Sequence, residues 1–521
     1  MASRLGETIG RRMRAETGAV RKDHGGRLRV CLVYPNTYRV GMSSLGFQAI
    51  YHLLNAQGGV ACERCFLPDP EDLADLRRSG GPLVSYESET PVQQFDAIAF
   101  SVAYELDYVN VVRLLRLARL PVMREERGEE LPVVAAGGAA VSINPEPLAD
   151  LVDLFVVGEG EPACESLVSL LRAHRGDRGG LAAAAGGTAG LYAPALPRRK
   201  VTRQYARDLD AWPTHSRILT RETEFGDLFL VEAARGCGRG CKFCVTPACY
   251  WPLRWRSAGK VVEAARLGLE QRGAIGLVGA AVSDHPEIEE IASGIVGMGG
   301  RLSASSLRAD TISPGLVRAL ARSGARSITL APEAGSERLR GEIGKGISDE
   351  EVVAAVRLAA AEGIREVKLY FMVGLPGERE EDAAAIPGLV RRCLEAAELR
   401  RVTVAAGGFV PKPHTPYERE AMAAPEDLSR RLRLIREALR GERRVRVALE
   451  SAKWSHVEGA LSRGDRRLGR VIARAEERGG NLGAWRSAFR ESGLAPEEFT
   501  GARGEGEELP WGFVRPRGGP R

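Results

Sequence analysis

The sequence predicts an α/β protein with a doubly wound N-terminal domain, a partial (β/α) barrel and a small helical C-terminal region. Short apolar runs of strand length alternate with helical patterns in both halves of the chain, as parallel sheets require. Glycine-rich loops follow several of these runs. At about 150 residues per domain, 521 residues suffice for two to four domains. We expect a basic leader at 1–26, the doubly wound domain at 27–171, a linker or insertion at 172–205, the barrel at 206–420 and the helical region at 421–521.

The N-terminal domain opens with a strand at 28–34, a loop that bears glycine and serine, and a helix at 47–54. This strand–loop–helix unit is the beginning of a doubly wound fold. Further strands are expected at 95–102, 132–136 and 151–157, with helices at 109–117 and 164–171. Ligands of such sheets bind beyond the carboxyl ends of the strands, where the glycine-rich loops lie.

The barrel is predicted by a second series of alternating elements. Residues 172–200 are rich in Gly, Ala and Arg without a period, which is typical of a linker. A strand at 228–233, a helix at 259–271 and strands at 275–278, 301–308, 327–330, 366–373 and 402–410 follow. From residue 425 the pattern is helical, with Leu428, Leu432 and Ile435 on one face.

Three cysteines follow the first barrel strand in a Cys-x3-Cys-x2-Cys spacing: Cys237, Cys241 and Cys244. Glycines before and between them allow the loop to wrap one compact metal centre without backbone strain. A structural zinc site needs a fourth ligand, for which Cys249 is the nearest candidate. The spacing alone leaves an iron–sulfur cluster, a zinc ion and unligated thiols open.

This loop resembles that of radical S-adenosylmethionine (SAM) enzymes, and Phe243, between the second and third cysteines, fits the pattern of that family. The resemblance implies that the three thiolates hold a [4Fe-4S] cluster whose fourth iron binds the amino and carboxyl groups of SAM. It covers about residues 228–417.

Four downstream segments resemble the SAM-binding segments of the family, and one of them is the end of the strand at 301–308, whose Ser and Arg suit the SAM carboxylate or ribose. The segment at 279–281 stands where the family has a Gly-Gly-Glu-like motif, so a backbone carbonyl is expected to meet the SAM amino group. The segment at 331–336 resembles Gly-x-Glu-Ser-Gly, and 374–378 reads Gly-Leu-Pro-Gly-Glu beside the expected adenine pocket. The implied SAM contacts are Gly279, Ala280, Ser305, Arg308, Glu333 and Gly374, together with Phe243.

The N-terminal domain resembles the cobalamin-binding, Rossmann-like domain of the B12-dependent radical SAM branch. The Asp-x-His-x-x-Gly motif that supplies a histidine to cobalt is absent, and His24 and His52 do not stand in that context. The resemblance therefore leaves open whether the domain binds cobalamin or is a degenerate domain kept for substrate positioning or packing. Cys62 and Cys65 form a Cys-x2-Cys pair, but without a second pair they are expected to be ordinary thiols.

The resemblance implies reductive cleavage of SAM to a 5′-deoxyadenosyl radical, with cobalamin-dependent methylation of an unactivated carbon as the most specific reaction. RNA modification of the methylthiotransferase kind is an alternative, although Cys31, Cys62, Cys65 and Cys164 do not reproduce the usual second-cluster pattern. An iron–sulfur redox sensor is another. The catalytic residues and the substrate are not identified, and His414, in a Pro-Lys-Pro-His-Thr-Pro segment, either faces the substrate or is an ordinary loop histidine.

Composition and charge suggest the compartment and the partners. Nine cysteines are too few and too dispersed for a disulfide scaffold, and residues 1–26 lack an apolar signal segment, so we expect a cytoplasmic protein without membrane association. The family implies an electron donor such as flavodoxin or ferredoxin. Residues 430–521 carry 21 Lys and Arg against 13 Asp and Glu. This excess suggests RNA contact through the C-terminal region, although solvated helix faces in an arginine-rich chain also explain it.

Overall fold

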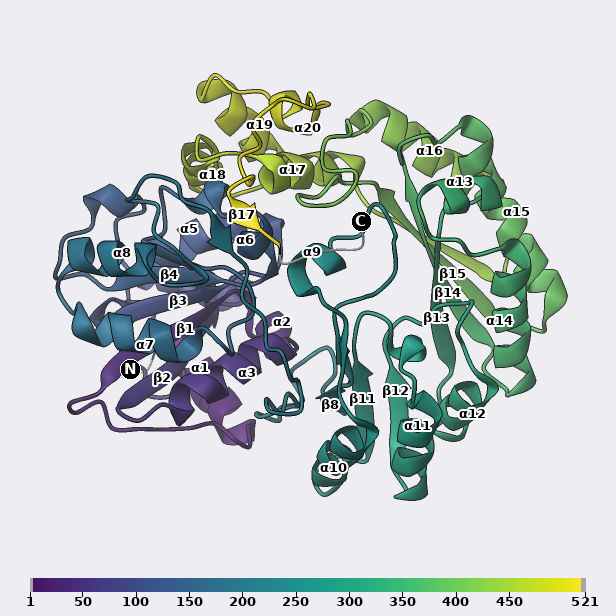
Figure 1. The fold of residues 1–521 in the computed structure, drawn as a ribbon, viewed down its shortest axis with the longest axis horizontal. Helices are drawn as coiled ribbons and strands as arrows, with labels where there is room; N and C mark the ends of the chain where they lie inside the picture. The colour runs from purple at the N-terminus through teal and green to yellow at the C-terminus, as the bar shows by residue number, and fades with distance from the viewer. Residues whose placement is uncertain (1–2, 517–521) are drawn as a thin grey trace.

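The computed structural model describes residues 3–516 and shows the N-terminal domain facing a partial barrel (Figure 1). The N-terminal sheet has the order β2-β1-β3-β4-β5-β6, in which β1 to β5 are parallel and β6 is antiparallel to β5. Its strands are β1 (Leu28–Thr37), β2 (Val60–Leu67), β3 (Ala97–Ser101), β4 (Val133–Gly137), β5 (Leu154–Val156) and β6 (Leu191–Tyr192). The predicted doubly wound domain is confirmed.

Helices cover both faces of this sheet, so its central strands are apolar on both sides. They are α1 (Arg4–Ala15), α2 (Tyr38–Met42), α3 (Leu45–Ala56), α4 (Pro70–Ser79), α5 (Tyr108–Leu117), α6 (Ala139–Ile143), α7 (Cys164–Ala173) and α8 (Arg178–Gly186). The basic leader thus forms a helix, and the segment expected to be a linker supplies α8 and the edge strand β6.

The barrel consists of two parallel sheets that follow chain order, with strand orders β12-β11-β8 and β13-β14-β15-β16. The strands are β8 (Phe229–Glu232), β11 (Ala274–Val278), β12 (Arg301–Ala304), β13 (Ser327–Glu333), β14 (Glu366–Val373), β15 (Arg401–Gly408) and β16 (Val445–Leu449). A single backbone bridge, Leu307 to Leu330, connects the two sheets within the described chain. The barrel strand β16 lies inside the region predicted to be helical from residue 421.

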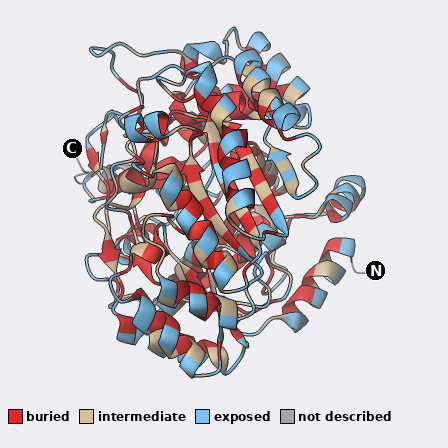
Figure 2. Cartoon of the chain, turned by 90° about the vertical axis from the view of Figure 1, so that its right-hand side faces the viewer, coloured by how far each residue is buried: buried red, intermediate tan, exposed pale blue. Residues whose placement is uncertain are grey.

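Helices pack their apolar faces on the outside of the barrel sheets, and their opposite faces are exposed (Figure 2). They are α10 (Ala258–Leu269), α11 (Ile288–Gly297), α12 (Pro314–Arg322), α14 (Asp349–Ala361), α15 (Glu380–Ala396) and α16 (Pro425–Ala438). The short helix α13 (Glu337–Glu342) instead buries Leu339 in a separate small core. The start of α14 is fixed by a capping box in which the Ser348 hydroxyl accepts the Glu351 amide and the Glu351 carboxylate accepts the Ser348 amide.

The C-terminal helices return to the N-terminal domain. These helices are α17 (Ala452–Arg463), α18 (Leu468–Glu477), α19 (Leu482–Glu491) and α20 (Glu497–Thr500), and the last described strand, β17 (Val514–Arg515), pairs with β7 (Val201–Thr202). Leu468, Ile472 and Trp485 are buried in the same core as the N-terminal sheet. This core ties the two ends of the chain together. None of the helices between residues 3 and 516 combines the length and apolar character that a membrane span requires.

Candidate functional site

A short hairpin closes the loop that carries the three cysteines. Strand β9 (Ala234–Arg235) pairs antiparallel with β10 (Arg254–Trp255), and the loop between them includes α9 (Thr246–Tyr250). Gly236 has a φ of 88°, and a Cβ there would collide with the carbonyl oxygen of Tyr250 and lie 2.9 Å from that of Pro252. Only glycine fits this position without strain. The Lys242 amide donates to the Ile343 carbonyl at 2.9 Å, which holds the loop against the end of α13.

The three thiols are free and half-buried, and Cys237 and Cys244 both lie close enough to Cys241 to affect its ionisation. Burial raises the pKa of Cys241, while Lys345 and Arg308 act in the opposite direction. Burial also raises the pKa of Cys244, whose sulfur is hydrogen-bonded by Thr246. In the described chain, no three His, Cys, Asp or Glu side chains are gathered tightly enough for a single metal ion. Three thiolates in a glycine-rich loop beside two cations suit a larger anionic cluster.

Cys249, the candidate fourth ligand, lies in a separate apolar contact with the N-terminal domain. It is buried with Ile143 and Ala248, and its sulfur is 4.0 Å from the carbonyl oxygen of Ala139 on α6. Burial raises its pKa to about 12. These contacts give Cys249 a packing role where the two domains meet.

The predicted SAM-contact residues divide into a group beside the cysteines and a group engaged elsewhere. Glu333, at the carboxyl end of β13, has a φ of 72° and accepts a hydrogen bond from Lys345 at 3.3 Å. Burial raises its pKa, and the neighbouring Lys345 opposes that shift. Arg308 forms two 2.9 Å hydrogen bonds to the Asp310 carboxylate. It is therefore held in place beside Cys241.

The remaining predicted contacts have backbone or turn roles in this structure. The Ser305 hydroxyl donates to the Gly279 carbonyl at 3.1 Å, so one of the carbonyls of the 279–281 segment already has a partner. Ala280 follows it and borders the large cavity described below. Gly374 has a φ of 81° in a turn. Phe243 packs on the small core around Leu339 and Phe409.

Two features beside the cysteines were not predicted from the sequence. Lys345 is buried in a Gly-Lys-Gly turn whose two glycines both have positive φ, a local signal that identifies a constrained lysine. Arg239, between the first two cysteines, donates to Asp284 at 2.9 Å and lies 3.7 Å from Asp310. These ion pairs join the cysteine loop to the segments that follow β11 and β12.

A cavity of about 540 Å³ lies between the N-terminal sheet and the cysteine loop. One wall is formed by side chains of the sheet and of α3 and α7, including Leu32, Ala135 and Leu167. The opposite wall is formed by Gly236 and Tyr250 of the loop and by residues at the carboxyl end of β11. Small residues make the room, among them Gly46, Ala49, Ala99, Ala136, Gly137, Gly138, Ala139, Gly158 and Gly160. The cavity lies where the carboxyl ends of the two parallel sheets face each other.

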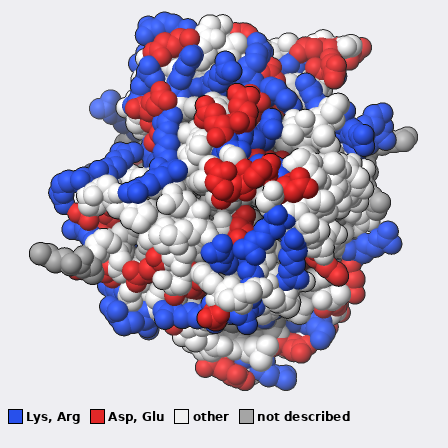
Figure 3. Space-filling view, turned by 90° about the vertical axis from the view of Figure 1, so that its left-hand side faces the viewer, with Lys and Arg blue, Asp and Glu red and all other residues white. Residues whose placement is uncertain are grey.

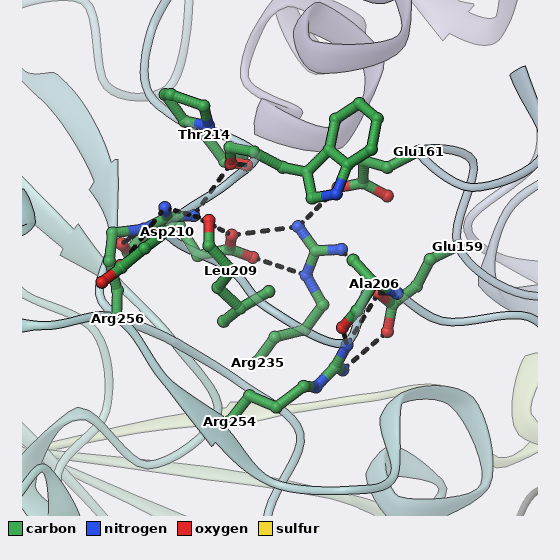
Figure 4. A network of polar contacts seen from close by, with 12 residues as sticks. Glu159, Glu161, Ala206, Leu209, Asp210, Thr214, Arg235, Arg254 and Arg256 are labelled. Carbon is green, nitrogen blue, oxygen red and sulfur yellow. Dashed lines mark hydrogen bonds and ion pairs between the residues drawn. The ribbon is translucent and has the colours of Figure 1, made fainter. Parts of the chain in front are cut away.

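A buried charge network joins this cavity to the cysteine loop (Figure 4). The Arg235 guanidinium, two residues before Cys237, contacts Glu159 at 2.9 Å, Glu161 at 2.7 Å and Glu232 at 2.8 Å. Arg254 forms two further bonds to Glu159, at 2.6 and 2.9 Å. Burial alone would raise the pKa of Glu159, but Arg254 and Arg235 outweigh it and lower that pKa. The network connects the loop after β5 to both strands of the cysteine hairpin.

The inner face of the four-stranded barrel sheet is partly open. Strand register places Thr329, Lys368, Thr403 and Arg446 in one row across it. Tyr370, on the same face as Lys368, is 37% exposed. This face of the sheet is therefore polar and incompletely covered.

His414 lies against the N-terminal domain. Its Nε2 is 3.1 Å from the carbonyl oxygen of Ile143 in the N-terminal domain, and burial lowers its pKa. The preceding Lys412 is paired with Glu105 at 2.7 Å and Glu458 at 2.8 Å. This loop therefore connects the barrel, the N-terminal domain and α17.

Comparison with known proteins agrees with both domains. Residues 231–390 match the radical SAM superfamily, and residues 46–194 match a family described as radical SAM proteins, N-terminal. An uncharacterised protein of Methanocaldococcus jannaschii is 31% identical over 449 residues, which cover 85% of this chain and 90% of the relative.

Solved structures show the same fold at low sequence identity. The radical SAM methyltransferase TsrM from Kitasatospora setae, with cobalamin and a [4Fe-4S] cluster bound, has a TM-score of 0.54 and 17% identity, covering 75% of this chain and 74% of its own. The cobalamin-dependent radical SAM enzyme OxsB, with aqua-cobalamin and SAM bound, has a TM-score of 0.53 and 13% identity, covering 89% of this chain and 70% of its own. The extent of the match to the methanogen relative, with the family matches in both halves, shows that this chain belongs to the radical SAM superfamily.

Proposed function

We propose that this chain is a cobalamin-dependent radical SAM methyltransferase that methylates an unactivated carbon. Cys237, Cys241 and Cys244 would hold the [4Fe-4S] cluster, and Glu333 and the backbone at Ala280 would contact SAM. The cavity between the two carboxyl edges would hold cobalamin. When bound, the cluster supplies the electron that splits SAM into methionine and a 5′-deoxyadenosyl radical, and cobalamin supplies a methyl group.

The residues around the cysteines suit this role. Lys345 and Arg308 place positive charge beside the thiols and favour an anionic cluster. Glu333 is half-buried and accepts a hydrogen bond from Lys345, which would hold its carboxylate in one orientation toward the cofactor. Phe243 and its apolar neighbours would limit the access of water to the radical.

The main support for cobalamin binding is that one continuous cavity is lined by residues of both domains. It extends from the interior of the N-terminal sheet to Gly279 and Ala280 at the end of β11, so one ligand could reach both domains. Its sheet wall is apolar, which suits the flat apolar part of a large cofactor, and Glu159 and Arg235 supply polar groups opposite. The fold shared with TsrM and OxsB, whose structures contain cobalamin, supports the same proposal.

The methylthiotransferase alternative needs a second cluster in the N-terminal domain. Cys31, Cys62, Cys65 and Cys164 are all buried, the first three inside strands β1 and β2. Burial raises the pKa of Cys31 and of Cys62 well above the ordinary value, which opposes the thiolate form that a cluster requires. These cysteines have the environment of structural core residues.

Anaerobic reconstitution followed by measurement of 5′-deoxyadenosine tests the SAM chemistry. Cys244→Ala should abolish both the cluster absorbance and the product, whereas the matched control Cys249→Ala should retain both because Cys249 packs against α6. Equal loss in the two variants would favour a four-cysteine metal site. A reconstituted cluster that binds no SAM would favour a redox sensor.

Extraction of bound corrinoid tests the second half of the proposal. Ala135→Leu adds three carbons inside the cavity and should reduce bound cobalamin at least tenfold while the iron content stays unchanged. Ala438→Leu, on the exposed end of α16, is the control for the same change in side chain. Corrinoid binding that Ala135→Leu leaves intact would contradict this assignment of the cavity.

A further inference from the structure

Arginines lead into six successive barrel strands at the edge opposite the cysteine loop. Because these strands are parallel, their amino ends lie along one edge of the two barrel sheets. We call this set the arginine rim; it comprises Arg272 before β11, Arg301 at the start of β12, Arg326 before β13, Arg365 before β14, Arg400 and Arg401 at β15, and Arg443 and Arg444 before β16.

Backbone hydrogen bonds place neighbouring rim residues side by side. The Glu366 amide donates to the Arg326 carbonyl at 3.1 Å, and the Arg400 amide donates to the Arg365 carbonyl at 2.8 Å. The Val402 amide donates to the Arg444 carbonyl at 2.8 Å. With strands about 4.8 Å apart, the part of the rim from β13 to β16 spans roughly 14 Å.

Most of the rim has no counter-charge. Within residues 3–516, only Arg365 and Arg400 have a carboxylate within 4.0 Å: Glu398 at 3.7 Å and Glu366 at 2.7 Å. All rim arginines except Arg272 are exposed. On the N-terminal side of the molecule, by contrast, positive and negative side chains are interspersed (Figure 3). The rim is therefore a surface of concentrated, uncompensated positive charge.

The C-terminal helices, where the sequence suggested RNA contact, differ from the rim. Arg466 pairs with Glu146, Arg467 with Asp465, and Arg478 with Glu491. Much of the positive charge of this region is thus neutralised by ion pairs. Between residues 430 and 516, the arginines that have no carboxylate partner and belong to a continuous row are those at the start of β16.

Helix dipoles do not account for the rim. A cation stabilises a helix C-terminus only within about the last turn. Arg326, Arg365 and Arg400 stand four residues beyond the ends of α12, α14 and α15, where the chain has already turned into the next strand. The doubled arginines at β15 and β16 add repulsion that folding alone does not require.

We propose that the arginine rim binds the phosphate backbone of single-stranded RNA without reading its sequence. Guanidinium groups bind phosphate oxygens in a bidentate manner, and a row of them follows a polyanionic strand. The rim runs along an edge of two differently oriented sheets. A flexible single strand can follow such an edge, whereas a flat lipid bilayer cannot contact all of it at once. RNA commonly presents single strands, whereas DNA is mostly held in duplexes. The rim lies opposite the cysteine loop, so bound RNA would leave the cofactor face open.

Fluorescence anisotropy with a 20-nucleotide oligouridine RNA tests this surface in the full-length chain. The fourfold variant R326Q/R401Q/R443Q/R444Q removes four exposed arginines that have no carboxylate partner in the described chain. With about 0.7 counterions released per phosphate contact, the slope of log affinity against log salt should fall by about 3. Between 50 and 200 mM salt, wild type should therefore lose about 50-fold more affinity than the variant.

The control R21Q/R207Q/R470Q/R486Q makes the same change in net charge at exposed arginines elsewhere and should keep the wild-type slope. Both variants should keep the wild-type unfolding temperature within a few degrees and the wild-type rate of SAM cleavage, so a failed radical SAM assignment would not affect this test. Equal slopes in wild type and the rim variant, or equal losses in the rim and control variants, would overturn the proposal. Binding to phosphatidylserine vesicles or to single-stranded DNA in preference to RNA would also overturn it.

Discussion

Replacement of Arg235 by methionine tests whether the buried charge network holds the cysteine loop to the N-terminal domain. The change removes the only cation within 4.0 Å of Glu161 in the described chain, while Glu159 keeps Arg254 and Glu232 keeps Arg256. Loss of one partner from a buried ion pair costs about 3–5 kcal/mol. Since two of the three carboxylates keep a partner, we expect a loss of about 3 kcal/mol in the free energy of unfolding.

Urea unfolding of the apo protein measures this loss. Adding Glu161→Gln to Arg235→Met should recover about 1–2 kcal/mol, because the stranded carboxylate is removed. Arg357→Met is the matched control: Arg357 pairs with Glu350 at 3.0 Å, but the two side chains are 55% and 64% exposed, so its loss should cost less than about 1 kcal/mol. Equal losses of stability for Arg235→Met and Arg357→Met, or no recovery with Glu161→Gln, would show that the network does not hold the cysteine loop in this way.

Two further predictions concern the cysteine loop and the N-terminal core. Gly236→Ala should lower iron incorporation and reduce the free energy of unfolding by about 1–3 kcal/mol, because Gly236 has a positive φ and a Cβ there would collide with the Tyr250 carbonyl. Gly240→Ala is the control and should have neither effect, because a Cβ at Gly240 meets open space. Equal iron contents in the two variants would contradict this prediction. Burial raises the pKa of Asp107 from 3.8 to about 6, against the hydrogen bond from Asn36. The native state therefore retains this proton longer than the unfolded chain, and about 3 kcal/mol of stability present below pH 4 is lost as the pH rises through 6. Asp107→Asn should remove this component from urea midpoints measured between pH 4 and 7, and an unchanged pH dependence would exclude it.

The sequence predicted most strands because apolar runs in parallel sheets are visible without knowledge of their neighbours. Strand β2 was missed because it contains Glu63 and Arg64. The structure explains how a strand accommodates them: Arg64 is fully buried between Glu16 and Glu87, at 2.7 and 2.6 Å. Glu16, directly after α1, and Glu87, in a later loop, offset the free-energy cost of burying this charge. No local sequence pattern identifies these two partners.

Strand β16 was missed for a different reason. It lies at the edge of its sheet, and its Val-Arg-Val-Ala-Leu sequence is short and follows a long helical pattern. Only its parallel pairing with β15 identifies it as a barrel strand.

In the candidate site, too, some features could be predicted from the sequence and others could not. Motifs located Glu333 and the cysteine loop, and the structure brings both to Lys345. The pairing of Arg308 with Asp310, and of the Ser305 hydroxyl with the Gly279 carbonyl, depends on how loops meet at the ends of strands. The Arg235 network joins residues more than seventy positions apart in the sequence, so it becomes visible only in the folded chain.

Electron paramagnetic resonance of the anaerobically reconstituted and reduced protein, before and after addition of SAM, tests whether the three cysteines hold a cluster that binds SAM. We expect a reduced [4Fe-4S] signal whose g values shift when SAM binds the iron that lacks a cysteine ligand. The same signal should be absent in Cys237→Ala. A cluster signal that SAM leaves unchanged, or tightly bound zinc in place of iron, would contradict the proposed radical SAM chemistry.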